Sequence, residues 1–352
     1  MNGKTTATLV LILGLTSGTA LTARAQQGAE ASAPNSQMQA VLDEFAALNP
    51  KPIESLLPVD ARKQPTIFDA VKVLIKEEGK PTDPEPVAKV QDMKIPGPAG
   101  DGDIAIRVYT PQGEGRFPIL VYWHGGGWVL ADLDTYDATP RALANAAGCV
   151  VVSCEYRKGP ENRFPAAADD AIAAYRWVLA NAPSIGGDPR RVAVGGESAG
   201  GNLAAVTALR ARDAGIAAPV HQLLIYPATN AAFDTPSYHQ FATAKPLNAA
   251  MMRWFWGYYI AKPEDGLNPY ASPLLDRRAG PLPSMTLITA EIDPLRSEGK
   301  AYADKLASSG VKVTYRNHQG VTHEFFGMSA VLDEAKKAID EAAAGLKTAF
   351  AQ

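Results

Sequence analysis

The sequence has little cysteine. Only Cys149 and Cys154 occur among its 352 residues, both inside a stretch with the pattern of one β-strand. Five positions along a strand place two side chains on opposite faces and about 16 Å apart, whereas a disulfide needs Cα atoms closer than about 7 Å. We therefore expect no disulfide, and two small buried side chains instead.

Basic clusters and long hydrophobic runs are also missing. The 34 lysine and arginine residues against 37 aspartate and glutamate residues give a net charge of −3, with no basic run. This pattern argues against a nucleic-acid partner. Beyond the N-terminus, no apolar run approaches the roughly 20 residues that span a bilayer, so no stable membrane anchor is expected. A composition of 46% hydrophobic and 20% charged residues is typical of a globular chain with one large core.

The first 25 residues have the pattern of a secretory signal peptide. Lys4 gives a positive start, an apolar run extends to about Leu21, and Ala23-Arg24-Ala25 forms a small-x-small cleavage signal. The alternative is an N-terminal membrane anchor, but the run is too short and too often interrupted by polar residues to span a bilayer. We predict cleavage after Ala25 and a secreted or periplasmic location.

Segments with strand and helix patterns alternate along most of the remaining chain. The predicted strands are Ile104–Thr110, Phe117–Trp123, Cys149–Glu155, Val192–Val194, His221–Tyr226, Met285–Thr289 and Val311–Tyr315. The predicted helices are Asp169–Ala180, Ala199 to about Arg212, Ser297–Ser308 and about Ala330–Ala349. Such alternation predicts an α/β fold whose central sheet is mainly parallel and covered by helices on both faces.

Two stretches do not fit this alternation. Residues 26–90 contain helical spacings interrupted by prolines, and end in a rigid proline-rich link. Between Tyr226 and Met285 lie about 60 residues, against a median connection of about 4–6. We expect this insertion, at about residues 228–282, to form a cap with the N-terminal stretch over a domain of residues 91–352.

A nucleophile motif occurs in the middle of the chain. Gly196-Glu197-Ser198-Ala199-Gly200 follows the predicted strand Val192–Val194 and opens a predicted helix, which is the context that the G-x-S-x-G motif requires. A sharp strand-to-helix turn brings backbones together, so the positions two before and two after the serine must lack bulk. The helix N-terminus then directs its backbone dipoles at developing negative charge. The sequence therefore predicts Ser198 as a nucleophile.

A glycine-rich motif follows an earlier strand. His124-Gly125-Gly126-Gly127 comes directly after the strand that ends at Trp123. Successive glycines let backbone N–H groups turn toward an approaching oxygen, so this loop and the N–H of Ala199 are expected to bind the oxyanion of a tetrahedral intermediate. The alternative is a plain glycine turn.

A serine hydroxyl needs a base, and the base needs an orienting acid. Of the five histidines, His318 and His323 come after the last predicted strand, and His323, in a loop before the final helix, is the better placed. Asp293 lies in the loop after the strand Met285–Thr289, and Glu291 is its rival. The chain order of Ser198, Asp293 and His323 is the order expected of α/β-hydrolases.

The sequence resembles the hormone-sensitive-lipase-like bacterial carboxylesterases, or family IV. The resemblance covers nearly everything from about residue 38 to 350, and its most specific motifs recur in order: HGGGW at 124–128, GESAGGN at 196–202, EIDPLR at 291–296 and GVTHEF at 320–325. It implies a triad of Ser198, Asp293 and His323, and an oxyanion hole of Gly126, Gly127 and Ala199. It also implies a two-part helical cap and esters with short or medium acyl chains as small-molecule substrates.

Two sites in the sequence depart from the pattern of that family. Glu197 replaces the commoner aspartate before Ser-Ala-Gly, and Lys158-Gly159 replaces a more apolar pair. Both could change the shape or charge of the pocket.

The expected reaction is acyl transfer through an acyl-enzyme, and it requires no metal or cofactor. Hydrolysis of amides or lactones by the same triad stays open, as does a non-catalytic binding protein, since fold does not fix function. We expect Trp128, Trp254, Phe255 and Tyr258 to contact the substrate. The alternative for the aromatic block at 254–259 is that it packs the cap onto the core.

Overall fold

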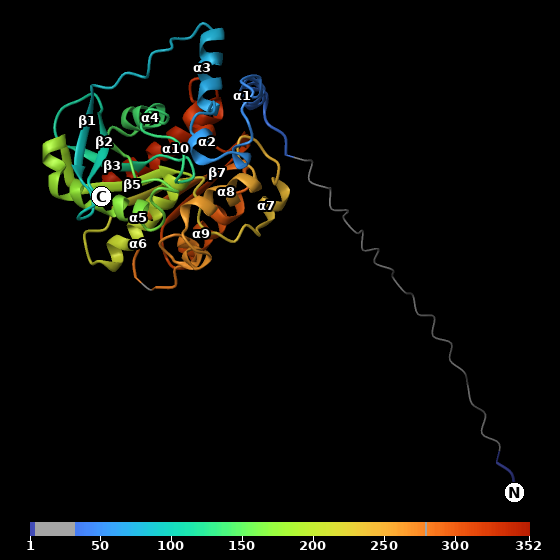
Figure 1. Ribbon diagram of the computed structural model, residues 1–352. Helices are drawn as coiled ribbons and strands as arrows, with labels where there is room; N and C mark the ends of the chain where they lie inside the picture. The colour runs from blue at the N-terminus through green and yellow to red at the C-terminus, as the bar shows by residue number, and fades with distance from the viewer. Residues whose placement is uncertain (4–31, 279) are drawn as a thin grey trace. The chain divides into compact units, whose positions relative to one another are not determined.

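The described residues form one eight-stranded β-sheet (Figure 1). The computed structural model describes residues 1–3, 32–278 and 280–352. The β1–β2 and β2–β4 pairs are antiparallel and the other five pairs are parallel. In order across the sheet, the strands are β1 (Lys89–Pro96), β2 (Asp103–Thr110), β4 (Val150–Cys154), β3 (Phe117–Trp123), β5 (Gly187–Glu197), β6 (His221–Ile225), β7 (Ser284–Ile292) and β8 (Val313–Thr322). The predicted α/β fold with a mainly parallel sheet is confirmed.

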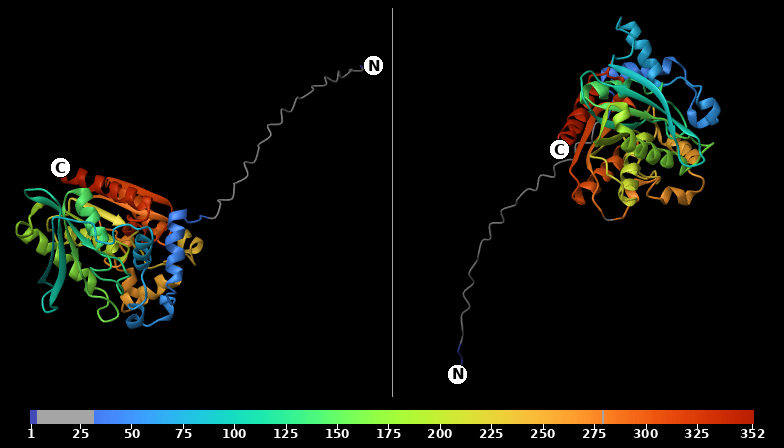
Figure 2. Two further views of the ribbon diagram at one scale, coloured as in Figure 1. Left: turned by 90° about the horizontal axis from the view of Figure 1, so that it is seen from above. Right: turned by 90° about the vertical axis from the view of Figure 1, so that its left-hand side faces the viewer.

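Helices cover both faces of the sheet (Figures 1 and 2). Val121 and Trp123 of β3 belong to one buried apolar core, whereas Leu120 and Tyr122 belong to the other, because successive side chains of a strand point to opposite faces. The first core includes residues of α5 (Ala166–Asn181), α6 (Ala199–Asp213) and α9 (Arg296–Ser308). The second includes residues of α4 (Ala138–Ala147) and α10 (Asp333–Phe350).

Two helical segments lie outside this alternation and touch each other. Asn248 Nδ2 donates to Glu54 Oε1 over 3.3 Å, and Trp254 Nε1 donates to the carbonyl of Leu56 over 3.0 Å. The N-terminal segment contains α1 (Ser36–Ala47), the short helix η1 (Ile53–Ser55), α2 (Pro58–Ala61) and α3 (Ile67–Glu77). The insertion between β6 and β7 contains α7 (Pro236–Gln240), α8 (Ala249–Tyr259), η3 (Pro263–Leu267) and η4 (Pro273–Leu275).

Several elements differ from the sequence-based expectation, among them β1, α4 and β8. β1 was not predicted, because its side chains are mostly exposed and show no apolar alternation; the expected boundary at residue 90 falls inside it. α4 was not predicted, because Leu143 is the only large apolar side chain among its ten residues. β8 extends to Thr322, so His318 lies within the strand and the prediction that it follows the strand is wrong.

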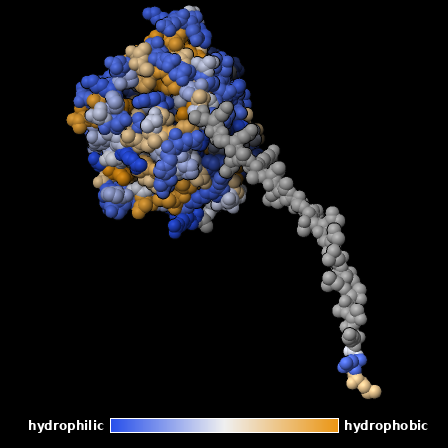
Figure 3. All heavy atoms as spheres, turned by 90° about the vertical axis from the view of Figure 1, so that its right-hand side faces the viewer, coloured by the Kyte–Doolittle hydropathy of each residue, from blue (hydrophilic) through white to orange (hydrophobic). Residues whose placement is uncertain are grey.

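The remaining expectations concern export, membranes and cysteines. The apolar run and the cleavage site of the predicted signal peptide lie outside the described residues. In the part of the chain that is described, no helix is long and apolar enough to cross a bilayer. On the face in Figure 3, hydrophilic and hydrophobic residues are interspersed. Cys149 and Cys154 are free and buried, which confirms that they form no disulfide.

Candidate active site

Ser198 occupies a sharp turn between β5 and α6. Its backbone has φ 55° and ψ −116°, and its N–H donates to the carbonyl of Ile225 over 2.9 Å. A Cβ on Gly200 would lie 1.9 Å from the carbonyl oxygen of Trp123, and a Cβ on Gly196 would lie 2.4 Å from the backbone of Gly200. The turn therefore has no room for a side chain two positions before or two positions after the serine, which is why the local sequence is G-x-S-x-G.

Three distant side chains meet at this turn. His323 Nε2 lies 2.9 Å from Ser198 Oγ, and His323 Nδ1 lies 2.7 Å from Asp293 Oδ2. His323 directly follows β8, and Asp293 directly follows β7. Since the carboxyl ends of neighbouring parallel strands share one edge of the sheet, the fold brings these groups together. Ser198 is 6% exposed, His323 3% and Asp293 0%, so water has little access to the relay.

Asp293 is held in a fixed orientation. Its second carboxylate oxygen, Oδ1, accepts the N–H of Leu295 over 2.8 Å. Each carboxylate oxygen therefore has its own partner, and Oδ2 is left facing the imidazole. A carboxylate in this position orients the ring and stabilises the imidazolium form.

The surroundings of His323 raise its pKa. Burial alone lowers the pKa of this imidazole, but the charge and hydrogen bond of Asp293, followed by the charges of Glu324 and Glu197, outweigh that effect. Glu324 is partly buried beside His323 and accepts a hydrogen bond from the Tyr136 hydroxyl over 3.2 Å. Burial in turn raises the pKa of the Glu324 carboxyl.

The pH profile of activity is expected to follow His323. A general base works in its neutral form, so kcat/KM should fall as the pH drops through its pKa, with a midpoint above the ordinary value of 6.5. Glu324→Gln removes one of the charges that raise this pKa, so the midpoint should move to lower pH. The measurement is kcat/KM from about pH 5 to 9 for both proteins. A variant midpoint at the same or a higher pH would contradict this account.

The glycine loop lies beside the serine and offers free amide groups. Gly126 has φ 96° and Gly127 has φ 60°, a left-handed region that glycine adopts without strain. Among the described residues, none accepts a hydrogen bond from the N–H groups of Gly126, Gly127 or Ala199. All three residues line the same cavity as Ser198 and His323. Three such donors beside a nucleophile form an arrangement that can bind an oxyanion.

The cavity has a volume of about 190 Å³ and is lined by both helical segments as well as the sheet edge. Of the four aromatic residues predicted to contact substrate, Trp128 and Phe255 line it, whereas Trp254 and Tyr258 are not among its lining residues. Trp254 packs edge-on against Tyr258, with ring centroids 4.8 Å apart. Sequence reasoning did not single out several lining residues: Phe45, Ile53, Phe68, Met251, Met252 and Glu324. Only Glu324 had a signal, because it directly follows His323.

Glu197, which departs from the pattern of the family, has a defined environment. Its carboxyl group is buried and accepts hydrogen bonds from the hydroxyls of Tyr122 and Tyr226. Burial raises the pKa of this carboxyl against the lowering effect of the hydrogen bonds. The Tyr226 ring lies 4.5 Å from the ring of His323. Glu197 therefore supports one wall of the imidazole site.

Glu291 and His318, the alternative acid and base, each have hydrogen-bond partners other than Ser198, Asp293 and His323. Glu291 accepts from Ser32 Oγ over 2.9 Å and from the N–H of Gly320 over 2.7 Å, so it holds the end of β8. His318 Nδ1 lies 3.0 Å from Glu334 of α10. The described residues contain no group of three or more His, Cys, Asp or Glu side chains arranged to hold a metal ion.

Comparisons with known proteins agree with this architecture. A family described by the α/β-hydrolase fold matches residues 120–327. Carboxylesterase NlhH of Mycobacterium tuberculosis is 38% identical over 296 residues, covering 81% of this chain and 91% of the relative. The ethyl acetate hydrolase of Pseudomonas putida is 36% identical over 292 residues, covering 82% and 89%. A solved esterase of Pyrobaculum calidifontis has a TM-score of 0.78 at 40% identity, covering 86% and 97%. The chain therefore belongs to the α/β-hydrolase fold family and, within it, to the hormone-sensitive-lipase-like carboxylesterases.

Proposed function

We propose that this enzyme hydrolyses carboxylic esters with short- to medium-chain acyl groups, using Ser198 as nucleophile, His323 as general base and Asp293 as orienting acid. The observation that carries the proposal is the continuous relay from Ser198 Oγ through both nitrogens of His323 to Asp293, with separations of 2.9 and 2.7 Å. Both distances lie in the range that proton transfer requires. The named relatives, a carboxylesterase and an ethyl acetate hydrolase, support the ester bond as the target.

The proposed reaction has two acyl-transfer steps. Ser198 Oγ attacks the carbonyl carbon while His323 Nε2 takes its proton, and the N–H groups of Gly126, Gly127 and Ala199 bind the oxyanion. The intermediate collapses with cleavage of the ester C–O bond, and His323 gives the proton to the departing alcohol. Water, deprotonated by His323, then attacks the acyl group on Ser198, and the acid leaves with the serine restored.

The cavity supports a limit on the size of the acyl group. Its volume of about 190 Å³ is below the roughly 300–1,000 Å³ of pockets that hold drug-sized ligands. Its lining is largely apolar and includes Leu247, Met251 and Phe255. A small apolar cavity favours short alkyl chains over long ones.

The test combines a substrate panel with active-site labelling. Rates on p-nitrophenyl esters from acetate to palmitate are expected to peak at short or medium chains and to fall steeply towards palmitate. A p-nitrophenyl phosphonate should attach once to the wild type, on the peptide that contains Ser198, and not to Ser198→Ala. Labelling of another residue would overturn the nucleophile assignment. Faster turnover of a matched anilide or lactone would favour the amidase or lactonase alternative.

We also propose export of the chain, with cleavage after Ala25. The support is the positive, apolar and small-residue pattern of the N-terminal sequence. N-terminal sequencing of the protein recovered from the periplasm or the medium should begin at Gln26. Recovery of uncleaved protein in the cytoplasm alone would contradict the proposal.

A further inference from the structure

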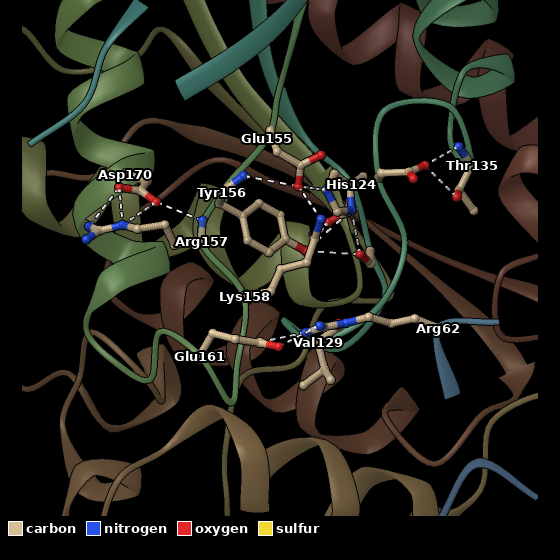
Figure 4. A network of polar contacts seen from close by, with 12 residues as sticks. Arg62, His124, Val129, Thr135, Glu155, Tyr156, Arg157, Lys158, Glu161 and Asp170 are labelled. Carbon is tan, nitrogen blue, oxygen red and sulfur yellow. Dashed lines mark hydrogen bonds and ion pairs between the residues drawn. The ribbon is translucent and has the colours of Figure 1, made fainter. Parts of the chain in front are cut away.

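The loop of the candidate oxyanion hole is fixed at its first end by an aromatic and charged cluster (Figure 4). The Tyr156 hydroxyl lies 3.0 Å from both the carbonyl of His124 and the carbonyl of Gly125. His124 Nε2 lies 3.1 Å from Glu155 Oε1, and Lys158 pairs with the same carboxylate over 2.5 Å. His124 is fully buried and stacks on the Tyr156 ring. This end of the loop is therefore held by the body of the α/β domain.

The second end of the loop is held from the N-terminal segment. Arg62, which directly follows α2, donates through Nε to the carbonyl of Val129 over 2.9 Å. Its Nη2 donates to the carbonyl of Gly159 over 2.8 Å, and its two terminal nitrogens form a fork on the carboxylate of Glu161 at 2.7 and 2.8 Å. Figure 4 shows the guanidinium beside the carboxylate of Glu161, with Val129 next to it. The planar guanidinium of an arginine can donate to these two carbonyls and the carboxylate at the same time, whereas the ammonium of a lysine cannot reproduce this set of hydrogen bonds.

Gly159 connects this arginine to the loop and to the insertion. Its N–H donates to the carbonyl of Trp128 over 2.9 Å, and its own carbonyl accepts from Arg62. A Cβ at this position would lie 2.3 Å from the carbonyl oxygen of Tyr258 in α8. The structure therefore explains the glycine of Lys158-Gly159, the pair that departs from the pattern of the family, because only glycine allows α8 to approach this point so closely.

Between the two anchored ends lie Gly126 and Gly127, which have the freest backbone dihedrals. Their N–H groups can point together at the oxyanion only if the carbonyls of Gly125 and Val129, on either side of them, stay in place. We propose that Arg62 is a positioning residue for the oxyanion hole: by holding Val129 and Gly159, it makes the alignment of Gly126 and Gly127 depend on docking of the N-terminal segment. This inference rests on the proposed esterase mechanism.

The ion pair itself contributes little to folding. The Glu161 side chain is 56% exposed, and exposed pairs contribute little to stability. The hydrogen bond from Arg62 lowers the pKa of Glu161 to about 2, so the pair stays ionised throughout the range in which an esterase is assayed. Loss of Arg62 should therefore change the rate more than the fold, and should do so equally at all such pH values.

The experiment compares Arg62→Met, Arg62→Lys and Glu161→Gln with Arg163→Met. Arg163 is the matched control, because its guanidinium binds the carbonyls of Gly257 and Ile260 but no atom of the oxyanion loop. Both Arg62 variants should lower kcat for p-nitrophenyl butyrate by about tenfold with little change in KM, since a misplacement of about 1 Å can cost about 10²-fold and a smaller shift costs less. Glu161→Gln should have a smaller effect, and Arg163→Met should keep kcat near that of the wild type.

A second measurement distinguishes misalignment of the oxyanion hole from a general loss of order in the active site. A trifluoromethyl ketone that forms a hemiketal with Ser198 should lose affinity in the Arg62 variants in proportion to kcat/KM, whereas the non-fluorinated methyl ketone should bind as before. The pH midpoint of kcat/KM should not move. Arg62 variants with unchanged kcat and ketone affinity, a rise in KM alone, or an equal loss in Arg163→Met would each overturn the inference. If the wild type neither hydrolyses the ester nor binds the fluorinated ketone, the proposed function itself fails.

Discussion

An Asp293→Asn variant is expected to fold like the wild type and to hydrolyse esters with a kcat lower by about 10⁴-fold, the loss seen when the acid of a triad becomes an amide. Asp293 faces Leu295 N–H with Oδ1 and His323 Nδ1 with Oδ2. In the variant, the amide oxygen keeps the N–H of Leu295, so the NH₂ group faces Nδ1. The imidazole must then carry its proton on Nε2, and it is unable to take the proton of Ser198.

The measurement is kcat for p-nitrophenyl butyrate, with the melting temperature as a check on folding. Glu291→Gln is the matched control, because it makes the same change of charge on a carboxylate whose partners are Ser32 and Gly320 rather than His323. We expect a far smaller loss of kcat in this control. If Glu291→Gln reduced kcat more than Asp293→Asn, the orienting acid would have been assigned to the wrong residue.

A Gly126→Ala variant is expected to lower kcat by about 10²–10³-fold, the effect of losing one donor of an oxyanion hole. Its φ of 96° is unfavourable for alanine, and the new Cβ would lie 2.3 Å from the carbonyl oxygen of Leu130. That oxygen belongs to the backbone of the same tight turn, in which Leu130 N–H donates to the carbonyl of Gly126 over 2.8 Å. The turn must therefore shift, and the amide donors shift with it.

The backbone strain of alanine at a positive φ should by itself lower the stability of the protein. The control is therefore a variant with the same kind of strain at a position outside the active site. Gly215, just beyond the end of α6, has φ 62°, and a Cβ added there would meet nothing within 4 Å. Gly215→Ala should lower the free energy of unfolding by roughly 1–2 kcal/mol and leave kcat unchanged. A Gly126→Ala variant with near-normal kcat would show that this amide does not stabilise the transition state.

The parts of the fold that were predicted from sequence are those with a strong local signal. β3 is almost continuously apolar because both of its faces are buried, and this pattern is typical of a central parallel strand. β1 lacks such a signal because its side chains are mostly exposed. α4 was missed because its buried face consists mostly of small side chains, with Leu143 as the only large apolar residue.

The lining of the cavity was predicted less well. In α8 nearly every position from 254 to 259 is aromatic, so the sequence shows no polar side by which to orient the helix. The sequence therefore did not distinguish Phe255, which lines the cavity, from Trp254 and Tyr258, which are not among its lining residues. The N-terminal lining residues, such as Phe45 and Phe68, reach the cavity only through contacts between segments distant in sequence.

The sequence by itself determined which groups are available and in what local geometry: a serine flanked by glycines between a strand and a helix, a glycine loop after a strand, and an acid and a histidine later in the chain. Backbone sterics act over a few residues, so these features can be predicted from the local sequence. Tertiary structure alone decided which of the aromatic rings line the cavity, and that Arg62 holds the oxyanion loop. These depend on side-chain directions across segments far apart in the chain, where a rotation of one helix or strand exchanges one neighbour for another.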